Sequence, residues 1–98
     1  MPTHEQLLSF WRDWDNLTAA QQRHFRRAVG KFVEDLAHRG MFRSGLRVKR
    51  VQGTDGIFEM TWADDGRATF QYGSPIEENE PHIVWRRIGT HKVFGAPY

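Results

Sequence analysis

Hydrophobic residues follow a helical spacing in the first 40 positions and alternate with polar residues after Gly45. Two segments carry apolar residues three and four positions apart, which predicts two helices, the second over about 19–39. A capping-box pattern opens each segment, at Thr3-x-x-Gln6 and at Thr18-x-x-Gln21. Gly40 is well placed to end the second helix. We therefore expect a helical hairpin, with no strand before Leu7.

The rest of the chain alternates with a period of two, which is typical of strands with one buried face. Residues 46–51 predict a first strand, 56–72 predict a hairpin closed at Asp64-Asp65-Gly66, and 82–88 predict a last strand. We expect one domain, residues 1–98, of the α+β class. Its N-terminal helical hairpin would pack on the apolar face of a four-stranded antiparallel sheet.

The central hairpin separates polar from apolar side chains. If its three turn residues form the loop, with Gly66 left-handed, Ala63 faces Arg67 across the hairpin. The polar face then holds Glu59, Thr61, Arg67, Thr69 and Gln71, and the apolar face holds Phe58, Met60, Trp62, Ala68, Phe70 and Tyr72. A two-residue loop would mix the two faces, so burial should select the three-residue loop.

Composition excludes several classes of chemistry. The 98 residues contain no cysteine, which excludes disulfides, thiolate zinc sites and a cysteine nucleophile. The five histidines lack ligand spacing, so we expect no metal, and no glycine-rich phosphate loop or Gly-x-Ser-x-Gly elbow occurs. No apolar run is long enough for a membrane span and no signal peptide is evident, which leaves the cytoplasm as the expected location.

The formal net charge is +2 and the basic surplus is mostly arginine, which allows an anionic partner without requiring one. A cluster on the second predicted helix, Arg23, Arg26 and Arg27, is either a phosphate-facing patch or a solvated helix face. Solvated faces of this kind are common, and this favours the second interpretation.

The polar face of the predicted sheet is the place where chemistry could occur. Arg47 and Lys49 on the first strand, Glu59 on the second and Arg67 on the third should point outward, and His91 follows the last strand. A carboxylate, an imidazole and fixed cations on one surface could cleave a phosphodiester without a metal. The competing interpretation is that cross-strand pairs of opposite charge only keep the face soluble.

Residues 36–94 resemble the RelE/ParE toxin superfamily, especially its RelE and HigB-like branches. The similar pieces are Leu46-Arg47-Val48-Lys49, Gly56-Ile57-Phe58-Glu59-Met60, Gly66-Arg67-Ala68-Thr69-Phe70 and Ile88-Gly89-Thr90-His91-Lys92-Val93-Phe94. The resemblance implies a toxin of a type II toxin–antitoxin system that cuts mRNA on the ribosome and so inhibits translation. It implies two partners, a cognate antitoxin and ribosome-bound mRNA, and no small-molecule cofactor and no membrane.

By position, the resemblance implies that Arg67 holds the scissile phosphate, that Lys49 is the basic residue of the preceding strand, and that Glu59 and His91 share the acid and base roles. It leaves open which of the two is the base. Further RNA contacts would come from Arg47, Arg86, Arg87 and Tyr98. A ParE-like inhibitor of DNA gyrase or a non-catalytic binding protein of the same fold remains the alternative. The joint presence of Glu59, Arg67 and His91 favours the nuclease.

Overall fold

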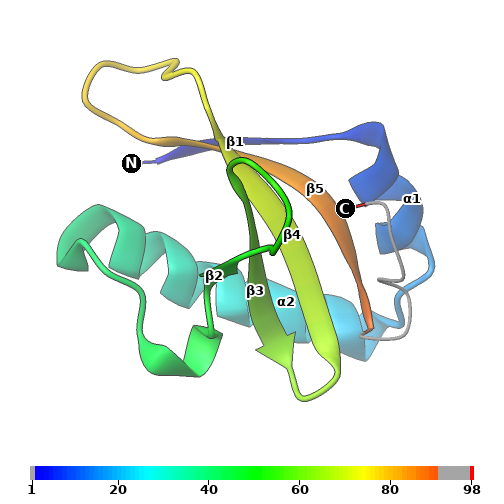
Figure 1. Ribbon diagram of the computed structural model, residues 1–98. Coiled ribbons are helices and arrows are strands. Elements are labelled where there is room, and N and C mark those ends of the chain that lie inside the picture. The colour runs from blue at the N-terminus through cyan, green and yellow to red at the C-terminus, as the bar shows by residue number, and fades with distance from the viewer. Residues whose placement is uncertain (1, 91–97) are drawn as a thin grey trace.

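A computed structural model describes residues 2–90 and Tyr98, apart from the side chain of Arg39. Its elements are β1 (Thr3–Gln6), α1 (Leu8–Asp15), α2 (Ala19–Glu34), a π-helical turn (Asp35–Arg39), a 3-10 turn (Ser44–Leu46), β2 (Lys49–Arg50), β3 (Ile57–Ala63), β4 (Gly66–Gly73) and β5 (His82–Thr90). They form one sheet of strand order β1-β5-β4-β3-β2, in which β1 is parallel to β5 and the other pairs are antiparallel. Helix α2 crosses one face of this sheet, and α1 lies beside β5 (Figure 1).

The segment at Thr3–Gln6 is a strand, so the expected helix start there and the four-stranded antiparallel sheet were wrong. The Leu7 N–H donates to the Trp85 carbonyl oxygen at 3.0 Å, and α1 begins at Leu8 without a side-chain cap. The buried ring of His82 contacts two polar side chains of the strand, with Thr3 Oγ1 2.7 Å from its Nδ1 and Glu5 Oε1 2.8 Å from its Nε2. Pairing with a distant strand therefore outweighed the local capping pattern.

The second helix agrees with its sequence pattern at both ends. The Thr18 and Gln21 capping box is complete, with both reciprocal hydrogen bonds present. At the other end, Gly40 has the expected left-handed backbone, at φ 70°. The last helical residues before it form a π-helical turn in place of α-helix.

The first predicted strand is much shorter than expected, because only Lys49 and Arg50 pair in β2. The buried carboxylate of Asp35 determines this. Its Oδ2 accepts hydrogen bonds from Arg43 N at 2.9 Å and Arg43 Nε at 2.8 Å, and its Oδ1 accepts one from Arg43 Nη2 at 2.7 Å. The chain then makes a 3-10 turn and passes through Arg47 in a left-handed conformation before β2 begins. As a result, β2 covers only Phe58 and Glu59 of β3.

The β3–β4 hairpin keeps the predicted faces with a different loop. Two residues, Asp64 and Asp65, close it, and Thr61 pairs with Arg67 after an irregularity in β3. The pairing is shifted by two residues from the expected register, and a shift of two leaves every side chain on its face. Gly66 is not left-handed. It is buried against Trp62, and a Cβ atom there would lie 2.4 Å from Trp62 Cε2.

The core lies between the sheet and the helices and is rich in aromatic rings. Its buried members include Phe10, Phe25, Phe32, Met60, Trp62, Phe70, Trp85 and Ile88. Tyr72, expected on the apolar face, is 46% exposed. Among the described residues, no helix combines the length and hydrophobicity that crossing a membrane requires.

Candidate phosphodiester site on the open sheet face

The sheet face opposite α2 carries a polar row across four strands. The strand register aligns Lys49 of β2, Glu59 of β3, Thr69 of β4 and Arg87 of β5. Neighbouring strands lie about 4.8 Å apart, so this row is about 15 Å wide. Lys49 Nζ lies 3.4 Å from Glu59 Oε1, and the two side chains are 71% and 20% exposed. The structure therefore brings together two of the predicted site residues.

Arg67 lies one row closer to the hairpin end, opposite Thr61 and Gly89. Its Nη1 donates to the carbonyl oxygens of Gly66 at 2.9 Å and of Ala63 and Asp64 at 3.4 Å each. Its Nε and Nη2 make no hydrogen bond within the described residues. One edge of the guanidinium thus holds the hairpin turn, and the other edge has donors free for an anion.

Arg86 and Arg87 follow one another on β5, where an irregularity in the pairing leaves Arg86 without a residue opposite. Arg86 Nη1 donates to Gln71 Oε1 at 2.6 Å, and Arg86 Nη2 donates to the Tyr98 carbonyl oxygen at 3.1 Å. Arg87 donates from Nε and Nη2 to the carboxylate of Asp13 on α1. These hydrogen bonds raise the pKa of Arg87. The charge of Arg87 is therefore largely offset by Asp13.

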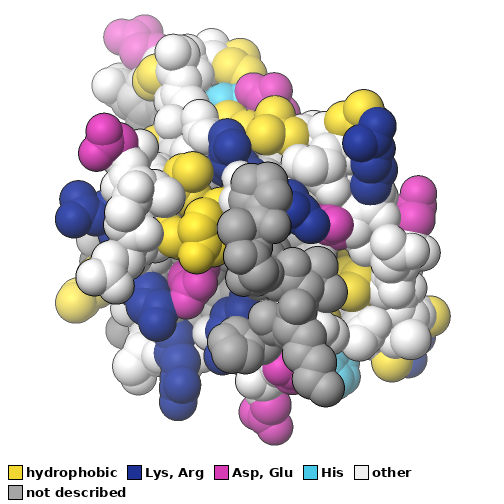
Figure 2. Space-filling model, turned by 45° about the vertical axis from the view of Figure 1, so that its right-hand side comes forward, with side chains coloured by type: hydrophobic (Ala, Val, Ile, Leu, Met, Phe, Trp, Pro, Cys, Tyr) yellow, Lys and Arg dark blue, Asp and Glu magenta, His cyan; other side chains and the backbone are white. Residues whose placement is uncertain are grey.

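On the face of the molecule that Figure 2 shows, Lys and Arg side chains are scattered, with Asp and Glu side chains between them. Arg47 is exposed and lies outside the strands, and His91 lies outside the described residues. No cluster of three metal-ligating side chains occurs within the described part of the chain.

Sequence reasoning missed the role of Asp13 and the burial of Thr69. Thr69 lies between Glu59 and Arg87 in the row and is fully buried, and its hydroxyl has no hydrogen-bond partner among the described residues. Asp13 binds both Arg87 and the Ile88 N–H, although the two segments lie more than 70 positions apart. The polar pattern placed Thr69 on this face but did not indicate its burial.

The face combines a carboxylate, a neighbouring ammonium group and a guanidinium with unused donors. A carboxylate can accept a proton from a hydroxyl, and a guanidinium can bind phosphate oxygens in a bidentate manner. These groups supply a proton acceptor and an anion-binding donor pair, the types of group that attack by a hydroxyl on a phosphodiester requires.

No family model and no curated protein matches the sequence. Solved structures do match the fold. The chain superimposes on a chain of the Escherichia coli DinJ-YafQ toxin–antitoxin complex with a TM-score of 0.65 and 15% identity, over 97% of this chain and 98% of that one. The chain has the RelE-like fold.

Two further structures share this RelE-like fold. A copper-bound mutant toxin from Helicobacter pylori matches with a TM-score of 0.63 and 12% identity, over 96% of this chain and 99% of that one. The RelB-RelE antitoxin–toxin complex from Methanococcus jannaschii matches with a TM-score of 0.57 and 14% identity, over 94% and 98%. The resemblance to the RelE/ParE superfamily is therefore confirmed for the fold.

Proposed function

We propose that this chain is the toxin of a type II toxin–antitoxin pair and acts as a metal-independent, ribosome-dependent mRNA endoribonuclease. The observation that supports the proposal most directly is that a carboxylate and a guanidinium with free donors occur on one surface of this fold. A chain with the RelE-like fold carries Glu59 and the free donor edge of Arg67 on the open face of its sheet. Similar folds occur in solved toxin–antitoxin complexes.

In the proposed reaction, Glu59 or His91 removes the proton from the 2′-hydroxyl of the RNA. The 2′ oxygen attacks the neighbouring phosphorus and the bond from phosphorus to the 5′ oxygen breaks. This leaves a 2′,3′-cyclic phosphate on one fragment, while the second acid–base group protonates the departing 5′ oxygen. The Nε and Nη2 groups of Arg67 stabilise the charge that accumulates on the phosphoryl oxygens. Lys49 orients the Glu59 carboxylate from 3.4 Å.

A cognate antitoxin is the proposed protein partner. It would inhibit by covering the same cationic face and competing with RNA, and an acidic segment would complement the surface. Translation inhibition would then depend on release of the antitoxin.

The proposal is tested by primer extension on mRNA from cells that express the chain. We expect cuts within translated regions, and we expect Arg67→Ala to abolish them. Arg67→Ala should leave the protein folded, because the hydrogen bonds from Nη1 contribute about 1 kcal/mol. The matched control Arg23→Ala removes an exposed arginine from α2 and should retain cutting.

Two outcomes would refute the nuclease. Toxicity with intact mRNA and a DNA-damage response would indicate a ParE-like inhibitor of DNA gyrase. Growth without toxicity and without mRNA cuts, from cells that contain the folded protein and no antitoxin, would indicate a binding protein.

A further inference from the structure

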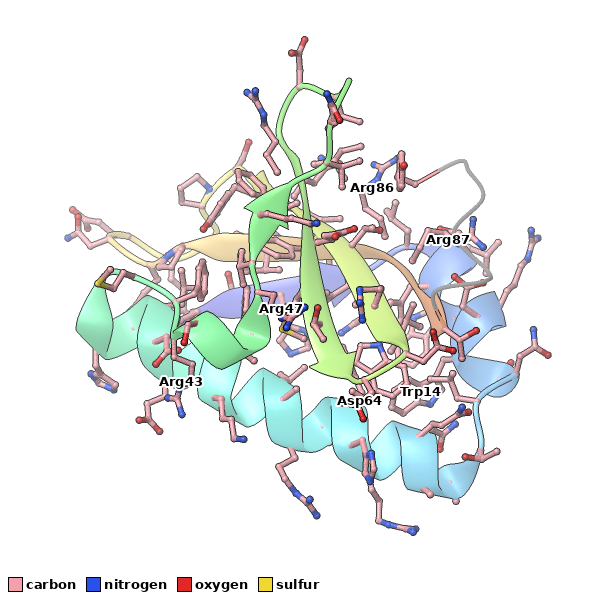
Figure 3. All side chains as sticks on the ribbon, turned by 60° about the horizontal axis from the view of Figure 1, so that its bottom comes forward. Trp14, Arg43, Arg47, Asp64, Arg86 and Arg87 are labelled. Atoms are coloured by element: carbon pink, nitrogen blue, oxygen red, sulfur yellow. The ribbon has the colours of Figure 1, made fainter. Side chains whose placement is uncertain are left out.

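A groove of about 520 Å³ lies between α2 and the hairpin end of β3, on the side where β2 leaves the strand uncovered. Arg43 and Arg47 lie on one side of it and Asp64 lies at the hairpin tip above α2 (Figure 3). The basic side chains that line the groove are Arg27 and Lys31 from α2, Arg43 and Arg47 from the segment before β2, and Arg67 from β4. Cations from three separate parts of the chain therefore converge on one surface.

Most of these cations make no ion pair within the described part of the chain. Arg43 is the exception, because its guanidinium binds Asp35 at 2.7 Å and Glu34 at 3.3 Å, and the hydrogen bond to Asp35 raises its pKa. Arg27, Lys31 and Arg47 make no ion pair with any described residue. Asp64 is the one carboxylate in the described lining. A concentration of uncompensated positive charge attracts an anion and adds little to stability of the fold.

One detail of the groove wall is consistent with a binding role. The backbone of Arg47 is left-handed, at φ 47° and ψ 45°. This conformation costs a residue with a Cβ atom about 1–2 kcal/mol. Such strain persists where the surroundings hold it in place, and here the Asp35–Arg43 contact anchors the preceding segment.

The groove is continuous with the candidate site, because Thr61 and Arg67 belong to both. Four of its five cations are arginines, whose planar guanidinium groups suit bidentate contacts with phosphate. The ring of Trp62 is buried against Gly66, so no aromatic platform for base stacking is exposed there. The lining thus favours a sugar–phosphate backbone over base recognition.

We propose that this groove binds the backbone phosphates of the single-stranded RNA next to the cleaved bond, without regard to base sequence. The inference rests on the proposed function for its choice of RNA. It assigns a role to Arg27 and Lys31, which lie on α2 and outside the open sheet face.

The test is fluorescence anisotropy of a labelled twelve-residue 2′-O-methyl oligouridylate, which cannot be cut, with the purified protein at several salt concentrations. Each phosphate contact with a single strand contributes about 0.7 to the slope of log affinity against log salt. Arg27→Gln with Lys31→Gln should therefore lower the slope by about 1.4 and weaken binding at low salt by about tenfold or more. The matched control, Arg12→Gln with Arg23→Gln, removes the same charge from exposed helical positions outside the groove lining.

The proposal is supported if the groove pair loses affinity and slope while the control pair stays within about twofold of the unchanged protein. Equal losses in both pairs would mean that only total charge matters, which overturns it. Binding of an acidic polyglutamate peptide that depends on Arg27 and Lys31, with RNA binding unaffected by them, would also overturn it in favour of a protein partner. If oligonucleotide binding depends on the groove but cells show no mRNA cuts, the nuclease proposal fails and the groove remains.

Discussion

Gly66→Ala tests the packing at the hairpin end, where the site and the groove meet. A Cβ at position 66 would lie 2.4, 2.5 and 2.7 Å from three ring carbons of Trp62, whereas carbon atoms in contact prefer about 3.5–4.0 Å. The ring would have to move by about 1 Å. Trp62 is 7% exposed and is packed against Phe25, so it has little space to move.

Overpacking of this kind costs about 1–3 kcal/mol, and Gly66 is paired on both sides, with Ala63 of β3 and Thr90 of β5. An alanine in a strand recovers about 0.5–1 kcal/mol relative to glycine. We therefore expect Gly66→Ala to destabilise the protein by about 1–2 kcal/mol, which lowers the melting temperature of a domain of this size by about 5–15 °C.

Gly30→Ala is the matched control. Gly30 lies within α2, and a Cβ there would meet nothing within 4 Å. The same substitution should therefore stabilise the protein by about 0.5–1 kcal/mol, because alanine favours the helix. Urea unfolding followed by far-ultraviolet circular dichroism measures both. A Gly66→Ala protein as stable as the unchanged one would refute the view that Gly66 is required by its contact with Trp62.

Two further predictions concern stability. Asp13→Ala removes the carboxylate that binds Arg87 and the Ile88 N–H, and it should lower the free energy of unfolding by about 2–4 kcal/mol. The control Asp15→Ala, at an exposed position, should change it by less than about 0.5 kcal/mol. Equal urea midpoints for the two variants would contradict this prediction. Burial raises the pKa of Tyr72 above its ordinary 10.0, so the folded state holds this proton more tightly than the unfolded state. The free energy of unfolding should then fall as pH rises from about 10 through the raised pKa, and Tyr72→Phe should reduce that fall; identical pH dependence in the two proteins would show that the phenol is not responsible.

The sequence predicted the features that depend on local periodicity. The spacing of Phe25, Val29 and Phe32 identified α2, and the alternation around Glu59 and Arg67 separated the two faces of the sheet. The faces were correct although the loop was not, because an irregularity in β3 restored the parity that a two-residue loop alone would have changed.

The errors arose from contacts between distant parts of the chain. Thr3-x-x-Gln6 and Thr18-x-x-Gln21 show the same pattern, yet the first became a strand because β5 and His82 offered it partners. The first predicted strand lost its beginning because Asp35 captures Arg43. No local sequence pattern indicates the pairing with β5 or the contact between Asp35 and Arg43.

The arginine cluster on α2 shows the same limit for the site. Arg26 lies over the ring of Trp14 at 5.4 Å, Arg27 lines the groove, and Arg23 is simply exposed. The solvated-face interpretation thus describes only part of the cluster. Arg27 faces the groove because β2 is too short to cover β3, which the sequence of α2 cannot reveal.

The most direct test of the central claim uses the purified protein with ribosomes that hold a defined mRNA in a translating position. The account predicts one cut at each codon position that the ribosome exposes, and an upstream fragment that ends in a 2′,3′-cyclic phosphate. The cut should be lost when the nucleotide before it is 2′-deoxy. Glu59→Gln and Arg67→Ala should each slow cutting by about 100-fold or more. The account would be contradicted if the 2′-deoxy mRNA were cut as well as the all-ribose mRNA. It would also be contradicted if the all-ribose mRNA stayed intact.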